Sequence, residues 1–180
     1  LVFGSAIHKA IEDSGGNVVK GIEVFNSEFT KEKLEEREHK KYDELLPIGL
    51  KIIQVYLSNI ENLHRLHGID MNGTKELKIN AFLENPLNGK KLVLPMYGRI
   101  DELTASNQIK ELKTSGRAYN PDDETFKLQT KLYALWMWSE KKILPKSINY
   151  IVFVKNMAVL NSVTPIQVIN LQYSVEDLAE

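Results

Sequence analysis

Apolar positions near the start of the chain recur at helical spacing. Ile7, Ala10 and Ile11 form a stripe after Ser5, which predicts a first helix that ends at Gly15-Gly16. Residues 28–42 are mostly charged and contain few apolar positions. They predict a second, charged helix with a solvated face.

A longer amphipathic helix is predicted from Pro47 to Gly68. Proline suits the first turn of a helix, where its missing N–H costs nothing, and glycine suits the end. The apolar positions between them recur three and four residues apart: Leu50, Ile53, Tyr56, Leu57, Ile60 and Leu63. We expect this stripe to pack on a sheet. His64 and His67 lack a partner at the spacing of a zinc site, so we do not assign them to a metal.

The middle of the chain changes to a period of two, which predicts strands. Residues 76–84 alternate in part between apolar and polar side chains. A second apolar run, Leu92 to Ile100, leads through a polar turn at Ser106-Asn107 into residues 111–113. Two such runs joined by a short polar turn predict a hairpin.

The last third of the chain predicts a helix, two strands and a final helix. Asn120, Asp122 and Asp123 are all suited to cap a helix that runs to about Trp138. Residues 147–154 and 165–171 are predicted strands, and Ser174 with Asp177 three residues later predicts the start of a last helix. This order of helices and strands indicates an α/β fold.

Three ionisable side chains are predicted to share one face of the central hairpin. Glu111 and Lys113 are two residues apart on a strand, so both point to the face opposite Leu112. If the strands pair, Asp101 reaches the same face. Burying two carboxylates and an ammonium group is costly unless they pair or bind a cation. The cluster therefore predicts either a structural group of ion pairs or a metal site.

Composition narrows the class of protein. The chain has 180 residues, of which 43% are hydrophobic and 26% charged, as expected for one globular domain over residues 1–180. With no cysteine, these residues form no disulfide, no thiolate zinc site and no iron–sulfur cluster. No apolar run approaches the roughly 20 residues that span a bilayer, so we predict a soluble, cytoplasmic protein without a membrane partner.

Charge and motifs limit the activities that this chain can have by itself. Its net charge of −1 provides no general attraction for nucleic acid, which would have to bind through local lysines or a metal. The chain also lacks the glycine-rich phosphate loop of nucleotide-driven motors.

Four short motifs together resemble the signatures of RecB-family nucleases in the PD-(D/E)XK superfamily. They extend over about 130 residues in the family's order: Gly4-x-x-x-His8-x-x-x-Glu12, Gly98-Arg-Ile-Asp101, Glu111-Leu-Lys113-Thr-Ser and Gln129-x-x-x-Tyr133. A single match to Asp followed by Glu-x-Lys is a weak indication of the family, because this pattern often occurs by chance. Four motifs in the family's order are a specific one. The segment that usually precedes Gly4 is missing and the chain begins at Leu1, which indicates a fragment that lacks its N-terminal segment.

The resemblance implies a restriction-endonuclease-like (PD-(D/E)XK) core, with a mixed central β-sheet flanked by helices and a metal-dependent DNA nuclease activity. By this resemblance Asp101, Glu111 and Lys113 are catalytic, and Lys113 orients or activates the attacking water. His8, Asp101, Glu111 and the backbone carbonyl of Leu112 would hold one or two Mg²⁺ or Mn²⁺ ions. The residues implied to support the site or approach DNA are Glu76, Thr114, Ser115, Arg117, Gln129 and Tyr133.

The most specific activity implied is that of an exonuclease in DNA repair, recombination or phage or CRISPR-type DNA processing. Its partners would be single-stranded DNA or duplex ends, and a helicase or another recombination protein. Exonuclease versus endonuclease action, strand polarity, DNA versus RNA and oligomeric state stay open. The alternative is a catalytically silent member of the same fold that binds nucleic acid or a partner protein. The intact set of Asp101, Glu111 and Lys113 argues against it. A restriction-type endonuclease would need a recognition domain, for which these residues show no sign.

Overall fold

The structure, a computed structural model, describes residues 2–36, 39–159 and 164–179. The chain divides into two compact units, each assembled from separate segments. Unit 1 contains Leu1–Leu63, Leu112–Ala118 and Val152–Gln167, and unit 2 contains His64–Glu111, Tyr119–Ile151 and Val168–Glu180. That residues 1–180 act as one nuclease domain stays a prediction.

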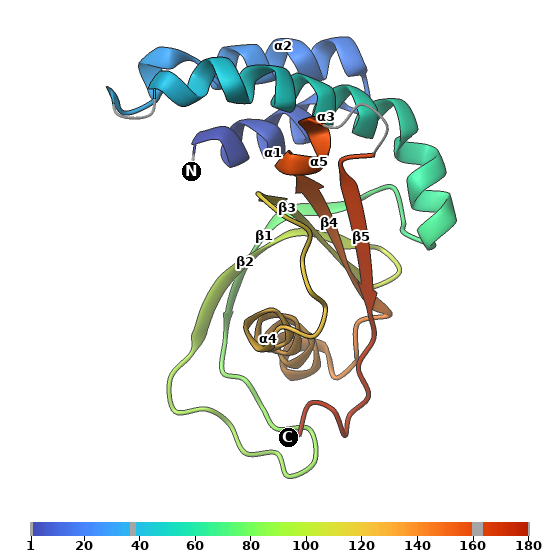
Figure 1. Ribbon diagram of the computed structural model, residues 1–180. Coiled ribbons are helices and arrows are strands. Elements are labelled where there is room, and N and C mark those ends of the chain that lie inside the picture. Colours follow the sequence, from blue (N-terminus) through green and yellow to red (C-terminus); the bar gives the residue numbers. More distant parts are fainter. Residues whose placement is uncertain (1, 37–38, 160–163, 180) are drawn as a thin grey trace. The chain divides into compact units, whose positions relative to one another are not determined.

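Five strands form one sheet in the order β1-β2-β3-β4-β5 (Figure 1). β1 pairs antiparallel with β2, and β2 with β3. The connection from β3 to β4 contains the helix α4, and a helical crossover is what neighbouring parallel strands require. The prediction of an α/β fold with a mixed sheet is thus confirmed. The strands are β1 (Gly73–Ala81), β2 (Met96–Thr104), β3 (Gln108–Ser115), β4 (Ser147–Val154) and β5 (Ile166–Leu171).

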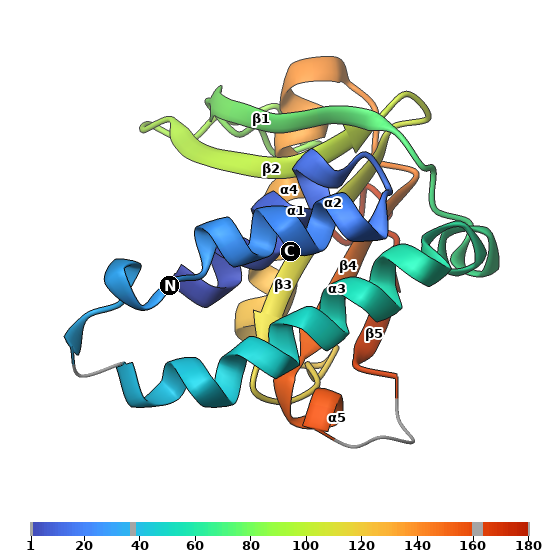
Figure 2. The same cartoon turned by 90° about the horizontal axis from the view of Figure 1, so that it is seen from above.

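Aromatic side chains hold the helices of unit 1 together. These helices are α1 (Val2–Ser14), α2 (Val18–Glu28), most of α3 (His39–His67) and the short α5 (Lys155–Val159). α1 and α2 lie side by side (Figure 2), and the ring centroids of Phe3 and Phe29 are 5.3 Å apart. Tyr56 of α3 meets Phe153 of β4 edge to face at 5.2 Å. The prediction that this helix packs on the sheet is therefore confirmed.

In unit 2, α4 (Glu124–Lys141) packs its aromatic face on the sheet. Of the three predicted caps, Asp123 is the one used, since its side chain accepts a hydrogen bond from the Phe126 N–H. Phe126 in turn meets the ring of Tyr150 in β4 at 4.6 Å. α4 also contacts β1, and Figure 1 shows it end-on beside that strand. None of the described helices is long and apolar enough to cross a membrane.

The single charged helix predicted over residues 28–42 is wrong. α2 ends at Glu28, a 3-10 turn follows at Lys31–Lys33, and α3 begins at His39, with residues 37–38 outside the described part. The reason is Phe29, which is fully buried between the rings of Phe25 and Tyr42 at 5.4 and 5.2 Å. Burying an aromatic side chain is worth more than extending a helix of exposed charges.

Pro47 does not begin a helix, because α3 starts at His39 and includes Pro47 in its interior. There the proline removes one backbone hydrogen bond. The predicted end is correct, since Gly68 has a φ of +63° just after the last turn.

The apolar run at Leu92–Leu94 lies outside the strand that it was predicted to begin. β2 starts at Met96, directly after Pro95, and Leu92, Val93 and Leu94 are exposed. Before Pro95, an isolated bridge joins Glu84 to Lys91, and the Leu92 N–H donates to the Leu83 carbonyl at 2.8 Å. Proline has no N–H for a strand ladder, which explains why the continuous ladder of β2 begins after Pro95.

The final helix is reduced to turns among the described residues 175–179. The predicted cap is nevertheless formed. The Ser174 N–H donates to Asp177 Oδ2 at 2.7 Å, and the Asp177 N–H donates to Ser174 Oγ at 3.1 Å.

Candidate active site

Hairpin pairing in unit 2 brings Asp101 and Glu111 together. Glu102 pairs with Lys110 and Leu103 with Ile109, so the same register continued by one residue places Asp101 opposite Glu111. The Asp101 backbone N–H donates to Glu111 Oε1 at 3.1 Å. Glu111 is fully buried and Asp101 is half-buried. Two carboxyl groups thus lie on neighbouring strands in a poorly solvated place.

Two residues of α4 support the strand that carries Asp101. Gln129 Nε2 donates to the Tyr133 hydroxyl at 3.1 Å. That hydroxyl donates to the backbone carbonyl of Arg99 at 3.3 Å, two residues before Asp101. Of these two residues, which the resemblance implies support the site, Tyr133 contacts β2 directly and Gln129 is linked to it through the Tyr133 hydroxyl.

Tyr150 lies near both carboxylates and was not predicted as a site residue. Its side chain is fully buried. Burial is the largest cause that raises the pKa of its phenol, and the charge of Glu111, with smaller contributions that include Asp101, raises it further. The phenol therefore stays protonated at physiological pH. The available signal in the sequence was a polar phenol inside the apolar run Ile148–Val154.

Glu76 lies on the strand next to Asp101 and has unusual backbone geometry. The neighbouring pairs Lys75 with Glu102 and Leu77 with Ile100 place Glu76 opposite Asp101. Its φ is +55°, a left-handed conformation that costs a non-glycine residue roughly 1–2 kcal/mol. Its carboxylate forms an ion pair with Arg99.

The other predicted site residues belong to unit 1. Lys113 is half-buried and lies two residues after Glu111 on β3, so the two side chains leave the same face of that strand. α1 packs closely against Thr114 at Gly4, where an added Cβ would lie 2.7 Å from Thr114 Oγ1. His8 is half-buried and follows Gly4 by one turn on the same face of α1.

Ser115 ends β3, and the chain bends at residues 116–117 directly after it. The Arg117 N–H donates to Ser115 Oγ at 3.3 Å, and the side chain of Arg117 is exposed. The peptide bond between Glu111 and Leu112 links the two groups of predicted residues, since one group belongs to each unit.

Metal binding at the candidate site is inferred from the chemistry of its donor atoms. Across residues 2–36, 39–159 and 164–179, no three His, Asp or Glu side chains come together in an arrangement that could hold a metal ion. Asp101 and Glu111 supply hard carboxylate oxygens, which are the ligands that Mg²⁺ and Mn²⁺ accept. The pair fits such an ion by its chemistry.

The other face of the same hairpin also carries buried charge. Lys110 Nζ lies 2.7 Å from Glu102 Oε2, and their side chains are only 6% and 9% exposed. His64 is buried nearby, and its pKa is lowered to about 4, first by burial and then by the charge of Lys110. Among the described residues, this group is a buried ion pair in which Glu102 Oε1 accepts no hydrogen bond, with a neutral histidine beside it.

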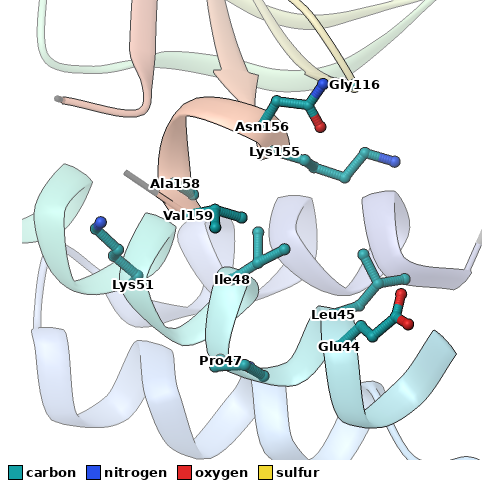
Figure 3. Close-up of a pocket in the computed structure, with 10 residues that line it drawn as sticks. All are labelled: Glu44, Leu45, Pro47, Ile48, Lys51, Gly116, Lys155, Asn156, Ala158 and Val159. Carbon is teal, nitrogen blue, oxygen red and sulfur yellow. The ribbon is translucent and has the colours of Figure 1, made fainter. Parts of the chain in front are cut away.

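A pocket of about 750 Å³ lies in unit 1 beside α3 and α5, and none of the predicted site residues lines it (Figure 3). The Asn156 N–H donates to the Gly116 carbonyl at 3.3 Å at its edge. Its lining is partly apolar, with Glu44 and two lysines: Glu44, Leu45, Pro47, Ile48, Lys51, Gly116, Lys155, Asn156, Ala158 and Val159. It is therefore distinct from the carboxylate pair.

Comparisons with known proteins do not assign a family. No family model matches the chain, and no curated protein matches it. The chain is similar to a solved structure titled "Crystal structure of SSO0001", with a TM-score of 0.40, 15% identity, and coverage of 79% of this chain and 64% of that one. It thus spans less than two thirds of that neighbour's length. A similarity of this size carries no argument about function.

Proposed function

We propose that the chain is a metal-dependent DNA nuclease in which Asp101 and Glu111 are the carboxylate ligands of the metal. The observation that carries the proposal is the fully buried Glu111, held beside Asp101 by the hydrogen bond to its backbone. Two carboxylates close together in a poorly solvated place repel each other, and a divalent cation between them would remove that cost. The four-motif resemblance to RecB-family nucleases supports the same reading.

Hydrolysis of a phosphodiester requires three things of this site. Negative charge at the scissile phosphate must be neutralised, a water must be positioned and made more nucleophilic, and the leaving oxygen must be stabilised. A bound Mg²⁺ or Mn²⁺ would supply Lewis acidity and a more acidic water.

The chain's own residues would then divide the remaining work. Lys113 would place a compact positive charge beside the attacking water and orient it. Gln129 and Tyr133 would keep β2, and with it Asp101, in position. By the resemblance, His8 and the Leu112 carbonyl complete the ligand set, and Thr114, Ser115, Arg117 and Glu76 assist around it.

The finer proposal is an exonuclease of the cytoplasm that processes single strands or duplex ends, alone or with a helicase. This part rests on the resemblance alone. A time course on DNA labelled at one end tests it, because an exonuclease releases labelled mononucleotides or short products first, whereas an endonuclease produces internal fragments.

Cleavage of unmodified DNA tests the central proposal. With Mn²⁺, the wild-type chain should degrade end-labelled single-stranded or duplex DNA, and EDTA should stop it. Asp101→Asn should lose the activity, whereas Asp122→Asn, an exposed control with the same change of charge, should keep it. DNA binding without cleavage in the wild type would contradict the proposal and favour the silent, nucleic-acid-binding alternative.

A further inference from the structure

Residues 73–99 form a projecting pair of strands, called here the β1–β2 arm, with an unusual surface. Many of its large hydrophobic side chains are exposed, and Val93 reaches 91% and Tyr97 73% exposure. The arm also carries five lysines and arginines against two glutamates, a net charge of +3 in a chain whose total is −1. The exposed hydrophobic residues of the arm are Phe82, Leu87, Leu92, Val93, Leu94 and Tyr97.

One face of the arm combines aromatic rings and cations. Lys78 pairs with Arg99, and Asn80 pairs with Tyr97, so these four side chains share a face. Phe82 follows two residues after Asn80 and is 52% exposed, continuing the alternation. With Asn80 opposite Tyr97, the same register places Phe82 diagonally across from Tyr97. Diagonal neighbours on adjacent strands are roughly 7–8 Å apart. We call this set of five the outer face.

The opposite face of the arm is already covered. Ile79, Ala81 and Leu83 are buried. The Glu84 N–H donates to Ser139 Oγ of α4 at 2.8 Å, and Lys142 pairs with the Glu84 carboxylate at 2.6 Å. The arm is therefore held to α4 through one side, which leaves the outer face open among the described residues of unit 2.

We propose that the outer face of the β1–β2 arm binds single-stranded nucleic acid. Tyr97 and Phe82 offer ring faces on which unpaired bases stack, and Lys78 and Arg99 lie where they can contact the phosphates of the same strand. Arg99 is kept in place by its ion pair with Glu76. Lys90 and Lys91 near the tip extend the positive charge. Binding through this face needs neither cleavage nor a metal.

The surface favours this ligand over duplex DNA or a membrane. Bases in a duplex are stacked on each other and expose no ring face to an aromatic side chain, whereas unpaired bases do. A membrane-binding surface places its cations around an apolar face, but here the paired cations Lys78 and Arg99 lie in line with the rings of Tyr97 and Phe82 on one face. The positive charge of the arm also complements phosphate directly.

Binding in EDTA tests the proposal on the full chain. The probes are a fluorescein-labelled 20-nucleotide oligothymidylate and a duplex of the same length, followed by anisotropy at several salt concentrations. The wild type should bind the single strand more tightly than the duplex. Tyr97→Ala should weaken single-strand binding about tenfold, given roughly 1–3 kcal/mol per stacked base, and Tyr97→Phe should restore it.

Two charge variants of the same kind separate this face from the general surface. Lys78→Glu should weaken binding and reduce its dependence on salt, because one phosphate contact is lost. Lys20→Glu, on the exposed side of α2, is the control and should do neither.

Several results would overturn the proposal. Equal affinity in wild type and Tyr97→Ala would do so, as would no single-strand binding at all. Preferential binding to anionic phospholipid vesicles, or a dimer by light scattering that Tyr97→Ala dissociates, would assign the face to a lipid surface or to a second copy. The binding assay contains EDTA and no metal, so none of these outcomes tests the proposed nuclease activity. A chain that cleaves DNA with Mn²⁺ but fails the binding assay would refute only the proposal for the outer face.

Discussion

Each face of the β2–β3 hairpin carries a cross-strand pair of ionisable side chains, but the charges of the two pairs differ. On one face Glu102 meets Lys110, and the two charges compensate each other at 2.7 Å. On the other face Glu111 meets Asp101, and both groups are carboxyls. Neighbouring residues on the same two strands thus form an ion pair on one side and a pair of like groups on the other.

This difference in charge indicates that one pair has a structural role and the other a chemical one. The two members of a buried ion pair compensate each other's charge, and removing one member leaves an uncompensated buried charge. Two carboxylates on neighbouring strands, one of them fully buried, repel each other, and a divalent cation between them would offset that repulsion. We therefore place the chemistry on the face of Asp101 and Glu111.

The largest expected effect is the loss of cleavage in Glu111→Gln. Removing a ligand of the proposed metal should lower the cleavage rate about 10³-fold or more, as is common when a transition-state charge loses its stabilising group. In EDTA the free energy of unfolding should stay within about 1 kcal/mol of wild type or rise, because a like charge is removed. Urea denaturation measures this. A large loss of stability in EDTA would show that Glu111 is a structural group instead.

The next effect is on stability and concerns the opposite face. Lys110→Met should lower the free energy of unfolding by about 3–5 kcal/mol, because Glu102 then stays buried without its partner. The double variant Glu102→Leu/Lys110→Met should recover most of that loss. If the single variant is as stable as wild type in urea, the ion pair does not have the role we assign to it.

Lys113→Ala should lower cleavage about 100-fold, within the usual range for a residue that assists proton transfer or positions a water. Its affinity for Mn²⁺ should stay close to that of wild type, since the lysine is not a ligand. Lys127→Ala, on α4, serves as a control with the same side chain removed. A fall in metal affinity equal to that of a ligand variant would contradict the role given to Lys113.

The smallest effect is a pH dependence that arises from His64. Its pKa is about 4 in the folded chain, against about 6.5 when unfolded. As the pH falls from about 6.5 towards 4, the unfolded chain gains a proton at His64 that the folded chain does not, so stability falls across this range. His64→Leu should flatten that part of the curve, measured as urea midpoints at pH 7 and pH 5. An unchanged difference between the two midpoints would exclude His64 as its source.

The hairpin and its residues could be predicted from the sequence because their determinants are local. Alternation places Glu111 and Lys113 on one face of a strand, and a polar turn pairs that strand with the one that carries Asp101. The cap at Asp123 and the end at Gly68 also depend on neighbours within a few residues.

The parts that sequence reasoning missed depend on distant partners. Phe29 breaks a charged segment because it stacks on Phe25 and Tyr42. Tyr150 lies near the carboxylates from another strand. The ion-pair partner of Glu102 is Lys110, which the local pattern did not single out. Such contacts are set by tertiary packing, to which periodicity and spacing are blind.

Calorimetric titration with Mn²⁺ tests the central claim most directly. Wild type, Asp101→Asn and Glu102→Gln should be titrated under the same conditions, since both substitutions remove one carboxylate from the same strand but from opposite faces. We predict that wild type binds Mn²⁺, that Asp101→Asn loses at least about tenfold in affinity, as expected when a ligand is removed, and that folded Glu102→Gln binds as wild type does. Absence of Mn²⁺ binding in wild type, or an equal loss in both variants, would contradict the account.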